Sequence, residues 1–210
     1  MTAKKAGAAP CAGIGLRAHS GWAALVAVAG TPRSPDVLVR RRIELSDPAV
    51  EGSKQPYHAA EGKPLPKAAR IIDRCAGDAG RLARQAFREV IAELQASGHR
   101  AAGCGLLLAS GRPLPALESI LASHALIHTA DGELFRDALA SAGEENGWTI
   151  TRVKEKEVYA AASAGLRVPA EELQSRVNAL RRSLGPPWTQ DQKLAAVAGW
   201  LALALSQEPV

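Results

Sequence analysis

The chain has 210 residues and a mass of 22.0 kDa, and 47% of its residues are hydrophobic while 22% are charged. This length suits one domain rather than two, and this balance excludes a disordered, collagen-like or coiled-coil protein. Aromatic residues make up only 4% of the chain and there is one Met, so we expect a core closed mainly by Ala, Leu and Val. Residues 1–10 are expected to form a flexible tail, and residues 11–206 a single domain.

The basic charge is concentrated in the first half of the sequence. The formal net charge is +5 and the pI is about 9.4, with +7 in the first 100 residues and −2 in the remainder. Clustered Lys and Arg side chains can replace the counterions around phosphates, which permits contact with a nucleic acid. A basic surface that serves only solubility is the other interpretation of so modest a charge.

Cysteine usage and hydropathy indicate the compartment. Cys11, Cys75 and Cys104 are an odd set without a paired spacing, which excludes a disulfide framework and a zinc knuckle. Free thiols are typical of a reducing compartment, so a cytoplasmic protein is expected. The longest apolar run, residues 194–205, has twelve residues, short of the roughly 18–20 needed to cross a bilayer, so no membrane contact is expected.

The N-terminal part predicts strands. Three short apolar runs with tight connections lie at residues 11–18, 22–29 and 37–45, which favours an antiparallel meander. Arg40, Arg41 and Arg42 lie within the third run, where successive side chains alternate between the two faces of a sheet. Residues 46–66 contain four of the thirteen prolines and predict a long loop. Tyr57, His58 and Glu61 within it form either a lid over the sheet or structural filler.

The rest of the chain alternates helices and strands. Apolar residues at spacings of three and four predict a helix over 67–97, and a glycine-bounded apolar run predicts a buried strand over 101–110. Further expected elements are a helix over 116–143, a strand over 148–153, and helices over 169–184 and 189–206. The last helix is apolar on nearly every side, so it is buried or packs in an interface such as a homodimer. This order predicts an α/β fold whose mixed sheet of about five strands has an antiparallel meander of three, then two parallel strands, with flanking helices.

Several segments resemble the ribonuclease H-like fold and, within it, the RuvC-like Holliday-junction resolvases. GIGLRAHSGWAALVAV resembles the family's first hairpin, and CGLLLAS resembles its fourth strand. ELFRDALASAGEENG followed by WTITRVKEKEV resembles its next helix and fifth strand, and DQKLAAVAGWLALAL resembles its small-residue C-terminal helix. The resemblance covers most of the chain. It rests on the order of the elements and on the kinds of residue within them.

The resemblance also implies a catalytic site of carboxylates, most of which this sequence lacks. Family members that cut nucleic acid use about four carboxylates to hold two Mg²⁺ or Mn²⁺ ions. The first strand of the family supplies an Asp, where this chain has Leu16 or Arg17, and residues 11–30 contain no acidic residue. Residues 101–110 contain none either, and the nearest carboxylate is Glu118. On the final helix only Asp191 is available, so the resemblance implies a nuclease scaffold without most of the catalytic carboxylates.

A cluster of polar residues lies on the helix expected over 116–143. His124, His128 and Asp131 share its apolar side at helical spacing, whereas Glu133 and Arg136 point away. Two neutral imidazoles and a carboxylate could hold one divalent metal ion, and protonated histidines could bind phosphate. The other interpretation is that the histidines bond to backbone carbonyls or to Asp131 at a partly buried helix start.

In the resembled fold this side of the helix lies near the functional edge of the sheet, where more polar residues could join it. The expected binding residues are Arg17, His19, Ser110, Arg112, His124 and His128. The sequence Ser110-Gly111-Arg112-Pro113 could offer backbone donors and a guanidinium to an anion, or be an ordinary turn.

Three hypotheses about function follow. The favoured one is a non-catalytic ribonuclease H-like domain, a binding or scaffold module for nucleic acid or a partner protein that needs no cofactor. The alternative is a divergent RuvC-like nuclease that uses Mg²⁺ or Mn²⁺, with His124, His128 and Asp191 as catalytic candidates and His124, His128 and Asp131 as candidate metal ligands. An ATP-using relative of actin and the sugar kinases would need a duplicated domain, for which the chain is too short.

Overall fold

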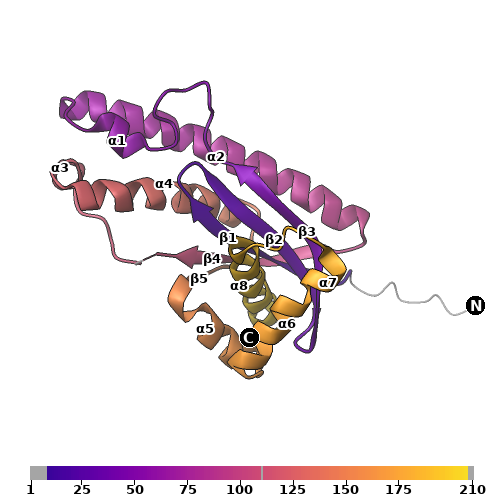
Figure 1. Cartoon of the computed structure of the whole chain (residues 1–210). Helices are drawn as coiled ribbons and strands as arrows, with labels where there is room; N and C mark the ends of the chain where they lie inside the picture. The colour runs from indigo at the N-terminus through magenta and orange to yellow at the C-terminus, as the bar shows by residue number, and fades with distance from the viewer. Residues whose placement is uncertain (1–8, 110, 208–210) are drawn as a thin grey trace, which may run out of the picture.

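A five-stranded mixed sheet forms the centre of the molecule (Figure 1). The structure, a computed structural model, describes residues 9–109 and 111–207, so Ser110 and residues 1–8 of the expected tail lie outside it. The strands are β1 (Cys11–His19), β2 (Trp22–Thr31), β3 (Ser34–Glu44), β4 (Arg100–Leu108) and β5 (Ile150–Lys154). Their spatial order is β3-β2-β1-β4-β5, with β1, β2 and β3 antiparallel and β1, β4 and β5 parallel. The predicted α/β architecture is confirmed.

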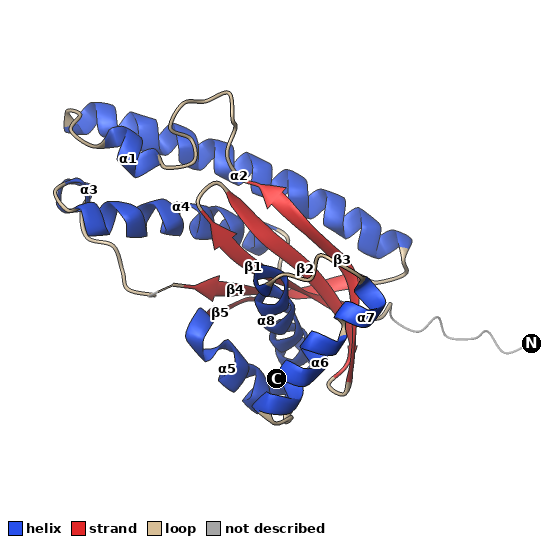
Figure 2. Cartoon of the chain, viewed as in Figure 1, coloured by secondary structure: helices blue, strands red, loops and turns tan. Residues whose placement is uncertain are grey.

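Helices cover both faces of this sheet (Figure 2). They are α1 (Pro56–Ala60), α2 (Leu65–Ala96), α3 (Leu117–Leu121), α4 (His124–Glu145), the 3₁₀ turn η1 (Glu155–Glu157), α5 (Val158–Leu166), α6 (Ala170–Ala179), α7 (Arg181–Leu184) and α8 (Gln190–Gln207). The long helices α2 and α4 lie on one face, and α5 to α8 lie on the other. Within the described residues, no helix combines the length and the apolarity needed to span a bilayer.

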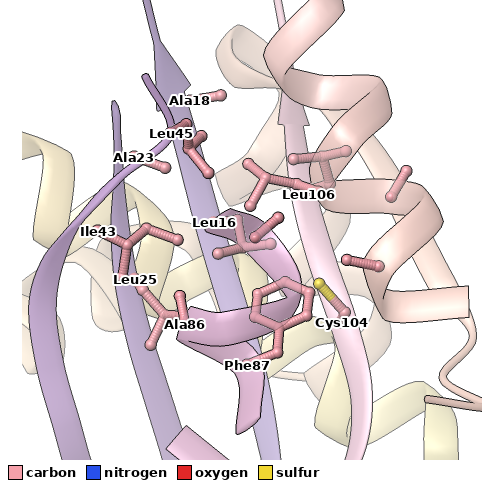
Figure 3. Close-up of a cluster of buried hydrophobic side chains, with 14 of the residues drawn as sticks. Leu16, Ala18, Ala23, Leu25, Ile43, Leu45, Ala86, Phe87, Cys104 and Leu106 are labelled. Carbon is pink, nitrogen blue, oxygen red and sulfur yellow. The ribbon is translucent and has the colours of Figure 1, made fainter. Parts of the chain in front are cut away.

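The core between the sheet and α2 is built from small and medium-sized apolar side chains. Leu16, Leu25, Cys104 and Leu106 project from the strands, and Phe87 from α2 packs among them (Figure 3). Burial raises the pKa of the Cys104 thiol to about 12, so this group is a neutral apolar filler at any physiological pH. The three cysteines are free thiols, as expected.

Helix α8 packs directly onto the strand backbones on the opposite face. Gly13 and Gly15 of β1 and Gly105 of β4 face it, and Gly199 is its own contact residue. A Cβ atom at Gly15 would lie 1.7 Å from the carbonyl oxygen of Ala195, so only glycine permits this approach. The residues of α8 from Leu194 to Leu203 are buried within the chain, which confirms that α8 is a core helix. A homodimer through this helix stays a prediction.

Each of the three consecutive arginines of β3 contacts another part of the chain. Arg40 donates hydrogen bonds to the carbonyls of Leu184 and Gly185 at the end of α7, at 2.5 and 3.1 Å, where a cation suits a helix C-terminus. Arg41 forms ion pairs with glutamates of α2. Arg42 lies over the Trp22 ring, 4.0 Å from its centroid. The predicted alternation between faces is confirmed.

Several segments differ from expectation, and among them the helix expected over 169–184 is divided into α6 and α7. The helix expected over 116–143 is divided into α3 and α4, because Ser123 has extended backbone angles of φ −135° and ψ 112°. Its carbonyl then accepts the first hydrogen bonds of α4, from Leu126 and Ile127. The long loop contains α1, which starts at Pro56, a residue suited to the first helical turn. The sequence analysis missed α5, which is a short, alanine-rich helix with little polar patterning.

Candidate functional site

Arg17 lies at the centre of an ion-pair cluster at the carboxyl ends of the parallel strands. Its Nε and Nη2 atoms donate to the two carboxylate oxygens of Glu155, at 2.8 and 2.9 Å. Its Nη1 atom also donates to the carboxylate of Asp191. Arg17 is near the end of β1, Glu155 directly follows β5, and Asp191 is in the first turn of α8. One guanidinium therefore joins three elements that are far apart in the sequence.

The bidentate pair favours the ionised form of Glu155. The hydrogen bonds from Arg17 hold the pKa of Glu155 below its ordinary value, because they stabilise the ionised form. The side chains of Arg17, Asp191 and Glu155 are 21%, 26% and 40% exposed, so water screens the cluster only in part. Glu155 was not a candidate in the sequence analysis, since its only signal there is its place directly after a strand.

His19 extends the cluster toward the surface. Its Nε2 atom lies 3.0 Å from Nη1 of Arg17 and 3.1 Å from Oδ1 of Asp191. Its ring stacks on Trp22 with centroids 4.2 Å apart and an interplanar angle of 10°. Burial, and then the charge of Arg17, lower the pKa of His19 below 6.5. At neutral pH the ring is therefore uncharged, and Nε2 can accept a hydrogen bond from Arg17.

An NMR titration should report this environment directly. In the unchanged protein, the pKa of His19 is expected below 6.5. In Arg17→Ala the neighbouring positive charge is gone and Asp191 remains, so the pKa of His19 should rise. An unchanged His19 titration in this variant would contradict the placement of Arg17 beside the ring.

A second cluster joins α1 to the start of α4. One ring nitrogen from each of His58, His124 and His128 lies within 4.8 Å of the others. The Nε2 atoms of His124 and His128 are 3.1 Å apart. His124 and His128 are exposed, and His58 is half-buried. The structure thus brings the two histidines of the expected metal set together and adds His58, which the sequence suggested only as part of a lid or as structural filler.

Asp131 supports this cluster from behind. Its Oδ2 atom is 2.5 Å from Nδ1 of His58, and its Oδ1 atom accepts the backbone N–H of Tyr57 at 2.7 Å. Asp131 is 1% exposed. Burial raises its pKa, while the hydrogen bonds from His58 and Tyr57 oppose that shift. Both oxygens of this expected metal ligand are therefore engaged by α1, because α1 packs against α4.

Two adjoining cavities lie beside these clusters. The first, of about 420 Å³, is lined by His19, His128, Glu133 and Arg136 among others. The second, of about 520 Å³, is lined by Arg112, Lys154 and Lys156 together with apolar residues. The two share Ala109 and Thr129. Of the expected binding residues, His19 and His128 therefore border one cavity and Arg112 its neighbour, whereas Ser110 lies outside the described residues.

The expectation that Glu133 and Arg136 point away from the core is wrong. Their side chains are only 15% and 13% exposed. They pair with each other at 3.1 Å, and Nε of Arg136 donates to the Leu107 carbonyl of β4 at 3.2 Å. Helix α4 packs on α2 with one side and meets the sheet with another. A pattern with one buried side and one exposed side therefore does not describe this helix. Conversely, His124 and His128 are exposed because the first turn of α4 faces α1 instead of the sheet.

Comparison with known proteins identifies the fold. No protein-family model matches the sequence, and no curated protein matches it. The structure is similar to that of Thermus thermophilus RuvC in complex with a Holliday junction substrate, with a TM-score of 0.52 and 13% identity, over 91% of this chain and 90% of that one. The chain has a RuvC-like, ribonuclease H-like fold. A second structure of the Thermus thermophilus RuvC protein gives a TM-score of 0.49 at 12% identity, over 91% of each chain. The similarity to the junction complex confirms the expected RuvC-like fold, and it concerns the fold alone.

Proposed function

We propose that this RuvC-like domain binds nucleic acid without hydrolysing it. The observation that carries the proposal is the position of Arg17, whose guanidinium contacts both Glu155 and Asp191. Arg17 lies on β1 at or next to the place where the resemblance implies a catalytic Asp. The positive charge that metal ions supply in the nucleases is here part of the chain itself.

These residues do not fit a pair of divalent cations. A guanidinium is always protonated in proteins and presents only donors. A divalent ion about 4 Å from it would be repelled by roughly 8 kcal/mol at an effective dielectric constant of about 20. The carboxylates of Glu155 and Asp191 already bind Arg17, and β4 carries no acidic residue to complete a metal site. The cluster is therefore unsuited to hydrolysis by a pair of bound metal ions.

The basic cavity next to the cluster supports nucleic-acid binding. Arg112, Lys154 and Lys156 line it, and none of the described residues that line it is acidic. Lys154 ends β5 and Lys156 follows Glu155. Both therefore lie near the carboxyl ends of the parallel strands, as Arg17 does. Lys and Arg side chains grouped in this way contact phosphate oxygens and fix the position of a nucleic-acid backbone. The RuvC structure compared above is itself a complex with a Holliday junction substrate.

The alternative of a divergent metal-dependent nuclease is less well supported. It would use His124, His128 and Asp131 or Asp191, together with Mg²⁺ or Mn²⁺. Asp131 is bonded to His58 and Tyr57, and Asp191 to Arg17. These carboxylates are thus engaged in two different clusters, whereas Mg²⁺ and Mn²⁺ need several oxygens around one point.

Binding and cleavage assays on the same DNA test the proposal. Fluorescence anisotropy is measured for a four-way junction and for a linear duplex of equal length, first in EDTA and then with Mg²⁺ or Mn²⁺. We expect binding in EDTA that weakens as salt increases, because counterions are released from the phosphates. No cleavage products are expected with either metal. Failure to bind DNA at low salt would overturn the proposal, and so would Mn²⁺-dependent cleavage that is lost in Asp191→Asn.

Paired variants locate the binding surface. The double variant Lys154→Ala, Lys156→Ala removes two cations from the basic cavity and should weaken DNA binding. The affinity of this variant should also depend less steeply on salt concentration, by an amount that corresponds to up to about two phosphate contacts. The double variant Arg181→Ala, Arg182→Ala is the matched control, since it also removes two exposed cations, which lie on α7, beside β3. Equal losses in both variants would indicate attraction by net charge alone.

A further inference from the structure

We propose that His58, His124 and His128 form a binding site for Zn²⁺ with three imidazole ligands and an open fourth coordination position. The site is separate from the Arg17 cluster, and it requires no part of the proposed nucleic-acid function. His124 and His128 are one turn apart on α4, and His58 comes from α1. Ligands from two elements allow three rings to converge on one ion.

The distances fit a single small cation. One nitrogen from each of the three rings lies within 4.8 Å of the other two. The His124 and His128 Nε2 atoms are 3.1 Å apart, close to the roughly 3.3 Å that separates two nitrogens in a tetrahedral zinc site with bonds of about 2.0–2.1 Å. The ring centroids of His58 lie 4.4 Å from His128 and 5.4 Å from His124, with steep interplanar angles of 64° and 88°. The rings therefore do not stack face to face.

Asp131 gives His58 the orientation and tautomer of a metal ligand. The carboxylate accepts the Nδ1 proton of His58, so that Nε2 keeps its lone pair for a cation. Tyr57 N–H holds the other oxygen of Asp131, which fixes the carboxylate in a buried position. A carboxylate behind a histidine in this way raises the basicity of the ligand and fixes its ring, as in many zinc sites. In this arrangement Asp131 is a positioning residue and does not touch the ion.

The donor set selects the kind of metal. Three neutral imidazoles suit Zn²⁺ and other late transition metals, whereas Mg²⁺ and Ca²⁺ need oxygen ligands. Because His124 and His128 are exposed, the fourth position is open to solvent. His128 also borders the cavity that contains His19 and Arg136. Three protein ligands and one open position are typical of zinc sites that bind water or a ligand, rather than of closed structural sites.

Metal titration of the full chain tests the proposal. The protein is stripped with EDTA, dialysed and titrated with Zn²⁺ against a chromophoric chelator. One Zn²⁺ per chain is expected. Asp131→Asn should weaken binding roughly 10- to 100-fold, because it removes only the orienting group, and His128→Ala should weaken it by more than that range. His99→Ala is the control, since His99 lies in the turn after α2 and bonds to Ser97, and it should bind Zn²⁺ as the unchanged protein does.

A spectroscopic measurement on the unchanged protein keeps the proposal testable if a variant does not fold. Zinc-edge X-ray absorption should show a shell of imidazole nitrogens. A shell made only of oxygens, sub-stoichiometric binding, or unaltered affinity in a folded His128→Ala variant would each overturn the proposal. DNA binding in EDTA is measured separately, so failure of the zinc site and failure of the proposed function are distinguishable.

Discussion

Gly15→Ala is expected to lower the free energy of unfolding by about 3 kcal/mol or more, which is the upper range for overpacking a core. The new Cβ atom would lie 1.7 Å from the Ala195 carbonyl oxygen and 2.5 Å from the Gly199 backbone nitrogen. These are backbone atoms of α8, so no side chain can rotate to make room, and the whole helix must shift from the sheet. Urea unfolding followed by circular dichroism measures the loss.

Gly77→Ala is the matched control for this substitution. Gly77 is within α2, and a Cβ atom there would have no described neighbour within 4 Å. Because alanine is the better helix former, this variant should gain roughly 0.5–1 kcal/mol. If Gly15→Ala were as stable as the unchanged protein, the direct packing of α8 on β1 would be incorrect.

Arg17→Ala is expected to lower the free energy of unfolding at pH 7 by about 1–2 kcal/mol, after allowance for the partial exposure of the pairs. The change leaves the carboxylates of Glu155 and Asp191 without the cation that they share. Arg81→Ala is the control, since it removes an exposed pair with Asp78 and should change stability by less than about 0.5 kcal/mol.

The stabilisation by Arg17 has a defined pH dependence. The pKa of Glu155 is lowered in the folded state by its hydrogen bonds from Arg17, so this contribution is fully present above the ordinary value of 4.5. It is lost as the pH falls through the lower pKa of the folded state. The difference in stability between the unchanged protein and Arg17→Ala should therefore narrow below about pH 4.5. A difference that widened in acid would contradict the ion pair.

Arg17→Ala also tests whether the guanidinium takes the place of a metal ion. With the fixed cation removed, Glu155, Asp191 and His19 become potential ligands for Mn²⁺. Millimolar Mn²⁺ should then raise the melting temperature of the variant by binding its native state, and the same test in Arg81→Ala controls for non-specific effects. The Zn²⁺ site is blocked in both variants by His128→Ala. Equal Mn²⁺ effects in the two backgrounds would argue against the proposed role of Arg17.

Local sequence signals were sufficient to predict the strand meander, the later alternation of strands and helices, and a last helix that is either buried or part of an interface. These features depend on signals within one segment, such as apolar periodicity, glycine and proline at turns, and small residues along one run. The absence of acidic residues from residues 11–30 and 101–110 was equally readable. Because local patterns persist in the folded chain, these inferences needed no knowledge of distant contacts.

The grouping of the polar residues depends on contacts between distant parts of the chain. Arg17 meets Glu155 and Asp191 across 138 and 174 residues of sequence, and His58 meets Asp131 across 73. No periodicity within one element encodes such pairings, because they depend on how separate elements pack. The packing of α4 also buries most of Glu133 and Arg136, and it leaves His124 and His128 exposed beside α1. The chain's local chemistry thus set its elements, while long-range packing set which side chains share a site.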